Sequence, residues 1–256
     1  MDQLHQHNFG AGPCILPLSV TEQAAKAVLN LDGIGLSILE VSHRSNEFLQ
    51  VMKETDQLVR ELLEVPEDYQ VLFLQGGASR QFDMVPQNLL QGSGKTKAAY
   101  LDSGYFAQKA IAQAKLFGQV QIVGSPRDKN YTYVPSYEQL DDDVAYLHVT
   151  SNNTIEGTQM SSFGNLGVPL VCDMSSDIFS RTIKISDFDL IYAGAQKNLG
   201  PAGMTLVIIK KELINDVVRP LPAMNDYRVM AENASLYNTP PVFAIYVAML
   251  NLRWLK

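Results

Sequence analysis

The chain has little of what a metal-binding or disulfide-stabilised protein needs. Among its 256 residues there are two cysteines, Cys14 and Cys172, which are too few and too far apart to indicate a disulfide framework or a metal cluster. Its four histidines form no metal-ligand pattern, because two lie near the start and the other two are isolated. We therefore expect no metal site.

Long apolar runs and an excess of positive charge are also missing. No run of 18 apolar residues could cross a bilayer, and no secretory signal peptide opens the chain. The net charge of −7 argues against a nucleic-acid or anionic-membrane surface. Charged residues make up 18%, too few for a disordered chain, and hydrophobic residues 46%, enough for a substantial core. The composition predicts a soluble, cytoplasmic protein.

Short apolar runs alternate with longer amphipathic ones along most of the chain. Strands that alternate with helices are typical of βαβ units, so we expect an α/β fold. Its centre is a mostly parallel sheet of seven strands with helices on both faces, a three-layer αβα sandwich. The expected strands are Val71–Leu74, Ala98–Leu101, Val120–Val123, Val144–Val149, Pro169–Cys172, Phe188–Tyr192 and Gly203–Ile209.

The two ends of the chain differ from this pattern. Residues 1–66 are helical in pattern and punctuated by glycine, and we expect them to pack on a large domain formed by residues 67–256. The last residues, FAIYVAMLNLRWLK, follow a helical pattern with no cap, glycine or polar tail. A natural chain seldom stops inside an amphipathic helix, so we expect a small C-terminal domain that is absent here.

Polar residues follow the ends of four expected strands. Ligands bind outside the carboxyl ends of parallel strands, so four loops should deliver polar groups to one edge of the sheet. The first of them, GGAS, precedes a helix expected from about Gln81. The four groups are Gly76–Ser79, Thr154, Asp173, and Gln196 with Lys197.

Each of these groups also has an ordinary structural explanation. GGAS is equally well a tight turn with a serine N-cap, and Asp173 alone is more often a helix cap. Thr154 suits a turn, and a lysine usually points to solvent. Together, however, a phosphate loop, a carboxylate and a later lysine match what one cofactor needs, pyridoxal 5′-phosphate.

The chemistry of that cofactor explains the residue types. A lysine amine with a lowered pKa in a desolvated site forms a Schiff base with the cofactor aldehyde. A carboxylate beside the pyridine nitrogen keeps it protonated, so that the ring accepts electrons. Glycines before a helix N-terminus let backbone N–H groups bind phosphate. In YAGAQKNLGPAG, Tyr192–Gly203, the predicted covalent anchor is therefore Lys197.

Six segments lie in order along essentially the whole chain: NFGAGP (8–13), SHRS (42–45), FLQGGAS (73–79), CDMSS (172–176), AGAQKNLGPAG (193–203) and YNTPP (237–241). Together they resemble the phosphoserine aminotransferase family of fold-type I pyridoxal-phosphate enzymes. That resemblance implies transamination between 3-phosphohydroxypyruvate and glutamate, giving phosphoserine and 2-oxoglutarate, in L-serine biosynthesis. In some members it extends to vitamin B6 biosynthesis. The family continues beyond Lys256 with a smaller domain that carries substrate arginines.

The resemblance also implies roles for individual residues around the cofactor. It puts the Schiff base on Lys197 and the pyridinium partner on Asp173. Where many members stack a tryptophan on the cofactor ring, this sequence has Phe106, which still offers an apolar face. The remaining cofactor contacts implied within one chain are Ala78 and Ser79 at the phosphate, and Thr154 and Gln196.

Further roles concern the substrate and a second subunit. Arg44, with His43 beside it, would bind an anionic substrate group. Some members have an arginine inside the glycine loop for the substrate phosphate, whereas here Arg80 comes one position later. Asn238 and Thr239 would reach the cofactor phosphate of the neighbouring subunit, which implies a homodimer with shared sites.

Three other interpretations stay open at this stage. Another fold-type I enzyme, such as a serine–glyoxylate or alanine–glyoxylate aminotransferase or a cysteine desulfurase, needs the same lysine and aspartate. A cofactor-binding or structural fragment without turnover is the second. A nucleotide-binding α/β domain is the weakest, because the chain lacks both GxGxxG after its first strand and GxxxxGK[ST].

Overall fold

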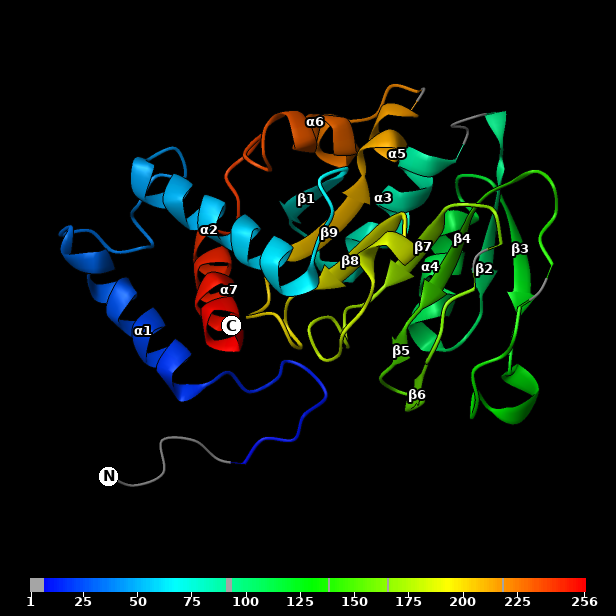
Figure 1. The fold of residues 1–256 in the computed structure, drawn as a ribbon, viewed down its shortest axis with the longest axis horizontal. Coiled ribbons are helices and arrows are strands. Elements are labelled where there is room, and N and C mark those ends of the chain that lie inside the picture. The colour runs from blue at the N-terminus through cyan, green and yellow to red at the C-terminus, as the bar shows by residue number, and fades with distance from the viewer. Residues whose placement is uncertain (1–6, 91–93, 138, 165, 218) are drawn as a thin grey trace.

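The computed structural model describes residues 7–90, 94–137, 139–164, 166–217 and 219–256. Seven strands form one sheet in the order β1-β9-β8-β7-β4-β2-β3, which runs from left to right across Figure 1. Each expected strand is present, with its ends shifted by two residues at most. The strands are β1 (Tyr69–Leu74), β2 (Lys97–Leu101), β3 (Gln119–Gly124), β4 (Val144–Thr150), β7 (Leu170–Asp173), β8 (Leu190–Gly194) and β9 (Thr205–Lys210).

The sheet is mostly parallel, as predicted. Strands β3, β2, β4, β7 and β8 run parallel to one another, whereas β9 is antiparallel to both β8 and β1. Residues 195–204 connect β8 to β9, and this connection is too short for the crossover that parallel neighbours need. The carboxyl ends of the parallel strands therefore share one edge of the sheet.

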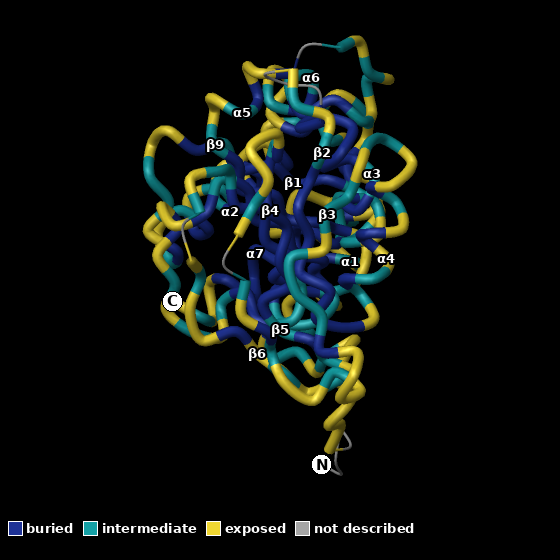
Figure 2. The backbone as a smooth tube through the Cα atoms, turned by 90° about the vertical axis from the view of Figure 1, so that its right-hand side faces the viewer, coloured by how far each residue is buried: buried dark blue, intermediate teal, exposed yellow. Residues whose placement is uncertain are grey.

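Helices cover both faces of the sheet, which confirms the three-layer prediction. Side chains alternate along each strand, so Val71 joins one buried cluster and Leu72 the other. The first cluster includes residues of α1 (Leu18–Leu29), α2 (Asn46–Leu63) and α7 (Val242–Leu255). The second includes residues of α3 (Gly77–Leu89), α4 (Tyr105–Ala114), α5 (Lys211–Asn215) and α6 (Tyr227–Glu232). Buried backbone fills the middle of the molecule in Figure 2.

Short elements complete the fold. Strands β5 (Asn152–Asn153) and β6 (Thr158–Gln159) form a two-residue antiparallel ladder directly after β4. In the part of the chain that the structure describes, no helix is both long and apolar enough to cross a membrane. Single turns of 3₁₀-helix lie at η1 (Leu31–Gly33), η3 (Arg127–Lys129), η4 (Ile185–Asp187) and η5 (Ala223–Asn225).

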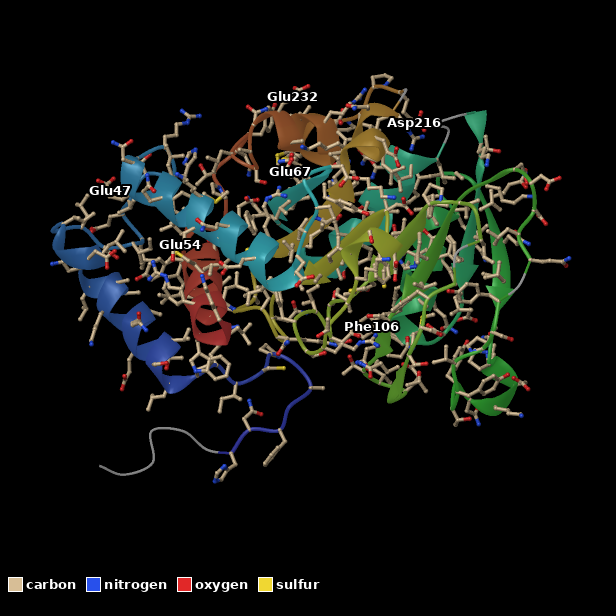
Figure 3. The ribbon with its side chains drawn as sticks, viewed as in Figure 1. Glu47, Glu54, Glu67, Phe106, Asp216 and Glu232 are labelled. Atoms are coloured by element: carbon tan, nitrogen blue, oxygen red, sulfur yellow. The ribbon has the colours of Figure 1, made fainter. Side chains whose placement is uncertain are left out.

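The first helices of the chain pack against its last one. Phe48 of α2 and Ile245 of α7 are fully buried in the same cluster. Glu54 of α2, labelled in Figure 3, accepts a hydrogen bond from Arg253 of α7, with Nη2 and Oε2 2.7 Å apart. Residues 1–66 contribute to the main core through α1 and α2, and a domain boundary at residue 66 stays a prediction.

Candidate active site

The predicted site residues converge where the parallel strands end. Asp173 is the last residue of β7, and in the ladder it lies between Thr150 of β4 and Tyr192 of β8. Lys197 follows β8 in the turn that leads to β9, and Thr154 follows β5. Directly paired residues of neighbouring strands point to the same face, so Thr150, Asp173 and Tyr192 share the face that α3 and α4 cover.

The amine of Lys197 lies among three predicted site residues. Its Nζ donates a hydrogen bond to Oγ1 of Thr154 and lies 5.4 Å from the ring centroid of Phe106. Burial lowers the pKa of Lys197, while the negative charge of Asp173 opposes that shift. A lysine with a lowered pKa has more of its amine in the neutral, nucleophilic form.

The N-terminal segment covers the stem of this lysine. A Cβ added at Gly12 would come within 2.8 Å of Cγ of Lys197, and the backbone N–H of Cys14 donates to the carbonyl of Gln196 at 3.0 Å. Gly12 also has φ +154°, at the margin of the region that side chains rarely adopt. This close approach explains why NFGAGP needs a glycine there, and it brings the first and fifth family segments together.

Asp173 is a buried carboxylate with few partners of its own. Its Oδ1 accepts the backbone N–H of Ser175 at 2.9 Å. Burial raises the pKa of Asp173, and the hydrogen bond from Ser175 and the charge of Lys197 only partly offset this. Beside it, the buried Oγ1 of Thr150 has no hydrogen-bond partner among the described residues. A buried acid next to an unpaired hydroxyl suits a polar ring atom of a ligand.

The glycine loop between β1 and α3 has the backbone geometry of the predicted phosphate loop. Gly76 and Gly77 have φ of +92° and +65°, a region that favours glycine. The expectation of a helix from about Gln81 is wrong, because α3 begins at Gly77. The N–H groups of Gly77, Ala78 and Ser79 thus lie in the first turn, where no intrahelical acceptor exists. Such N–H groups bind phosphate oxygens well.

The end of β8 adjoins this helix start. A Cβ added at Gly194 would lie 2.7 Å from Oε1 of Gln196 and 3.5 Å from the backbone nitrogen of Ala78. A glycine at this position therefore leaves room for both groups. The side chain of Ser79 is exposed at the same end of α3, where a bound phosphate could reach it.

Arg80 is already held within the chain. Its Nη1 pairs with Oδ2 of Asp83 at 2.6 Å, and its Nη2 donates to Oδ1 of Asn225. Asn238 lines a pocket together with Gly76 and Arg80. The carbonyl of Thr239 accepts from Nε2 of Gln75 at 2.9 Å, so YNTPP lies beside the glycine loop of its own chain. The reach of Asn238 and Thr239 into a partner subunit stays a prediction.

The structure places His43 and Arg44 apart from the other predicted residues. Both lie just before α2, whose start is far from the end of β8 in Figure 1. Arg44 is exposed, and within the described ranges its guanidinium forms no ion pair. Nε2 of His43 is buried, with no hydrogen-bond partner in the same part of the chain. Their role in binding substrate stays a prediction.

Sequence reasoning missed two residues that shape the site. Oγ of Ser175 accepts the N–H of Gly194 at 3.0 Å, so Ser175 links the ends of β7 and β8. A serine two positions after a buried Asp173 is a known turn signal that could have identified it. Thr150 ends an apolar run and has no local signal, because its importance comes from its position beside Asp173 on the next strand.

Comparison with known proteins agrees with this geometry. The aminotransferase class-V family model matches residues 6–256. The phosphoserine aminotransferase of Flavobacterium johnsoniae is 56% identical over 254 residues, which cover 99% of this chain and 71% of that protein.

Solved structures agree as well. The phosphoserine aminotransferase from Bacillus circulans subsp. alkalophilus superimposes with a TM-score of 0.94 at 44% identity, covering 98% of this chain and 70% of that one. The PLP-bound phosphoserine aminotransferase from Trichomonas vaginalis gives 0.91 at 38% identity, covering 98% and 75%. The chain therefore belongs to the class-V aminotransferase family and, within it, to the phosphoserine aminotransferases.

Proposed function

We propose that this chain catalyses the pyridoxal-phosphate-dependent transamination between 3-phosphohydroxypyruvate and glutamate that gives phosphoserine and 2-oxoglutarate, in cytoplasmic L-serine biosynthesis. The reaction is reversible, so it can be assayed from phosphoserine and 2-oxoglutarate. One observation carries the proposal. A partly desolvated lysine amine, Lys197, and a buried carboxylate, Asp173, lie within electrostatic reach of each other at the carboxyl edge of the sheet. The names of its similar relatives support the choice of substrate.

The residues present fit the cofactor. When bound, pyridoxal 5′-phosphate supplies an electron-accepting ring that stabilises the negative charge left after loss of the substrate α-proton. Asp173 is the residue to pair with the pyridine nitrogen, and its charge favours the protonated nitrogen. The N–H groups of Ala78 and Ser79 would hold the phosphate, while Phe106 offers an apolar face to the ring.

Lys197 has the chemistry for two tasks. Its neutral amine is the nucleophile that would anchor the cofactor, and the lowered pKa raises the fraction of that form. Once the substrate amine has replaced it on the cofactor carbon, the released Nζ would be free to carry the proton between the substrate α-carbon and C4′ of the cofactor. The hydroxyl of Thr154, which accepts from Nζ, orients the amine within the site. Gln196, the residue before Lys197, would add a cofactor contact.

A direct assay tests this proposal. The purified chain is mixed with pyridoxal 5′-phosphate, 2-oxoglutarate and either phosphoserine or alanine, and glutamate formation is measured. We expect a preference for phosphoserine of about tenfold to a hundredfold, because a hydrogen bond to a charged group contributes about 1.5–3 kcal/mol. A preference for alanine would favour a glyoxylate-type aminotransferase instead. The same assay with a phosphorylated vitamin B6 precursor tests the second biosynthetic role.

We also propose that the protein is a homodimer. In it, Asn238 and Thr239 of each subunit would complete the phosphate site of the partner. Asn238→Ala should weaken cofactor binding about tenfold, because it removes a hydrogen bond to a charged phosphate. The measurement is a cofactor titration followed at several protein concentrations, alongside sedimentation velocity. Asn233→Ala is the matched control, since this exposed amide donates, among the described residues, to the carbonyl of Val229 on α6. A monomer that binds the cofactor with undiminished affinity would contradict the shared site.

Arg44 offers a test of substrate binding. Its planar guanidinium suits the oxygens of a carboxylate or phosphate, a geometry that an ammonium does not reproduce. Arg44→Lys should raise KM for phosphoserine about tenfold and leave cofactor affinity nearly unchanged. Steady-state kinetics and a cofactor titration measure both quantities, with the exposed Arg127→Lys as control. An unaltered KM would make Arg44 an ordinary surface residue.

A further inference from the structure

The turn between β5 and β6 contacts the site in two directions. Thr154 accepts a hydrogen bond from Nζ of Lys197, as described above. Two residues later, Oε1 of Glu156 accepts the backbone N–H of Tyr105 at 2.8 Å. Tyr105 is the first residue of α4, and the residue after it is Phe106. One short turn therefore holds both the lysine amine and the start of the helix that carries the aromatic ring.

Glu156 takes the place of a helix cap that α4 lacks. The N-cap residue is Gly104, which has no side chain to accept an N–H group of the first turn. A Cβ at this position would lie 2.6 Å from the carboxyl carbon of Glu156, so the glycine makes room for that carboxylate. Its other oxygen, Oε2, is buried without a hydrogen-bond partner among the described residues. A negative charge here also interacts favourably with the positive end of the helix.

The turn itself is well fixed. The N–H of Gly157, which has φ +73°, donates to the carbonyl of Asn153 at 2.8 Å. Nδ2 of Asn153 donates to Oγ1 of Thr158 at 3.1 Å, and its Oδ1 accepts from Oγ of Ser103 at 3.1 Å. The bond from Ser103 joins the turn to the segment just before α4. These hydrogen bonds fix the backbone that carries Glu156.

We propose that Glu156 is a positioning residue, which caps α4 and thereby fixes the ring of Phe106 relative to the amine of Lys197. Three contacts link these residues. Glu156 accepts a hydrogen bond from the first residue of α4, and the ring of Phe106 on that helix lies near Nζ of Lys197. Nζ of Lys197 in turn donates to Thr154, which lies on the same turn as Glu156. Without the carboxylate, the first turn of α4 loses an acceptor and frays. This inference rests on the proposed function, because it assigns Phe106 to the cofactor ring.

Two substitutions at Glu156 test the inference in the full chain. Glu156→Ala removes the acceptor, and we expect faster hydrogen exchange in peptides covering residues 104–108 of the cofactor-free chain. Its affinity for pyridoxal 5′-phosphate, measured by absorption titration, should fall about tenfold, which corresponds to about 1.4 kcal/mol. The visible circular dichroism of the bound cofactor should also change. Glu156→Gln retains a carbonyl acceptor, so its affinity should stay within about threefold of the wild type.

Asp189→Ala is a matched control at the opposite end of β7. Oδ2 of Asp189 accepts the backbone N–H of Leu170 at 2.7 Å, so this variant also loses a carboxylate that accepts a backbone N–H. It loses in addition the ion pair of Asp189 with Lys210 at 2.7 Å. It should lower Tm without altering cofactor affinity or exchange at residues 104–108. If Glu156→Ala binds the cofactor like the wild type, or Asp189→Ala weakens binding equally, the positioning role is wrong. A wild-type chain that binds no cofactor would instead overturn the proposed function.

Discussion

Lys197→Ala is expected to abolish transamination while the chain still binds pyridoxal 5′-phosphate non-covalently. The substitution removes both the nucleophile and the group that moves the α-proton. Because general acid–base catalysis by one side chain alone contributes about 10²–10⁴-fold, the combined loss should exceed about 10⁴-fold. The N–H groups at the start of α3, which we predict to bind the cofactor phosphate, do not involve Lys197, so they should continue to hold it.

Borohydride treatment in the presence of the cofactor, followed by peptide mass analysis, checks this expectation. The wild type should carry the cofactor mass on Lys197, and Lys197→Ala should carry none. Lys26→Ala, which alters an exposed lysine of α1, should be labelled and active like the wild type. Label on any other lysine of the wild type would contradict the assignment of the anchor.

Asp173→Asn is expected to slow the reaction by about 10²-fold or more and to leave the label on Lys197. The amide keeps the shape, and its oxygen can still accept the N–H of Ser175. It lacks the charge that favours a protonated pyridine nitrogen, and each pKa unit of that preference corresponds to about 1.4 kcal/mol. Carbanion formation therefore slows, whereas attachment of the cofactor does not depend on this charge.

Stability measurements separate this effect from misfolding. Burial raises the pKa of Asp173, so its ionised form costs stability at neutral pH, and the neutral amide should leave Tm unchanged or higher. Asp226→Asn is the control, because this buried carboxylate caps α6 and pairs with Arg228 at 2.7 Å. The control should lower Tm and keep kcat. A variant of Asp173 with normal kcat would show that its charge is not needed.

The strands could be predicted because most of them are buried on both faces. Val144–Val149 is apolar apart from the buried His148, and β4 differs from it by one residue. The direction of β9 was not predicted, because an apolar run by itself gives no information on strand direction. Only the short return from β8, through residues 195–204, makes β9 antiparallel.

Local patterns were less informative at the glycine loop. Glycine is a poor helix former, so GGAS suggested a turn before a helix from about Gln81. In the structure, Gly76 serves as the N-cap in a left-handed conformation and α3 begins at Gly77. This earlier start converts the predicted phosphate loop into the first turn of a helix. The N–H groups available to an anion are therefore those of a helix N-terminus.

The amino-acid sequence by itself determined the seven strands, their alternation with helices and the placement of Asp173 and Lys197 at or just after strand ends. Each of these follows from residues close together in the chain, either the spacing of apolar residues or a polar side chain at the end of an apolar run. The tertiary structure alone decided that Gly12 lies against Lys197, that Thr150 adjoins Asp173, and that Glu156 caps α4. These contacts join residues far apart in the chain, and the backbone path that brings them together is set by the packing of the whole core.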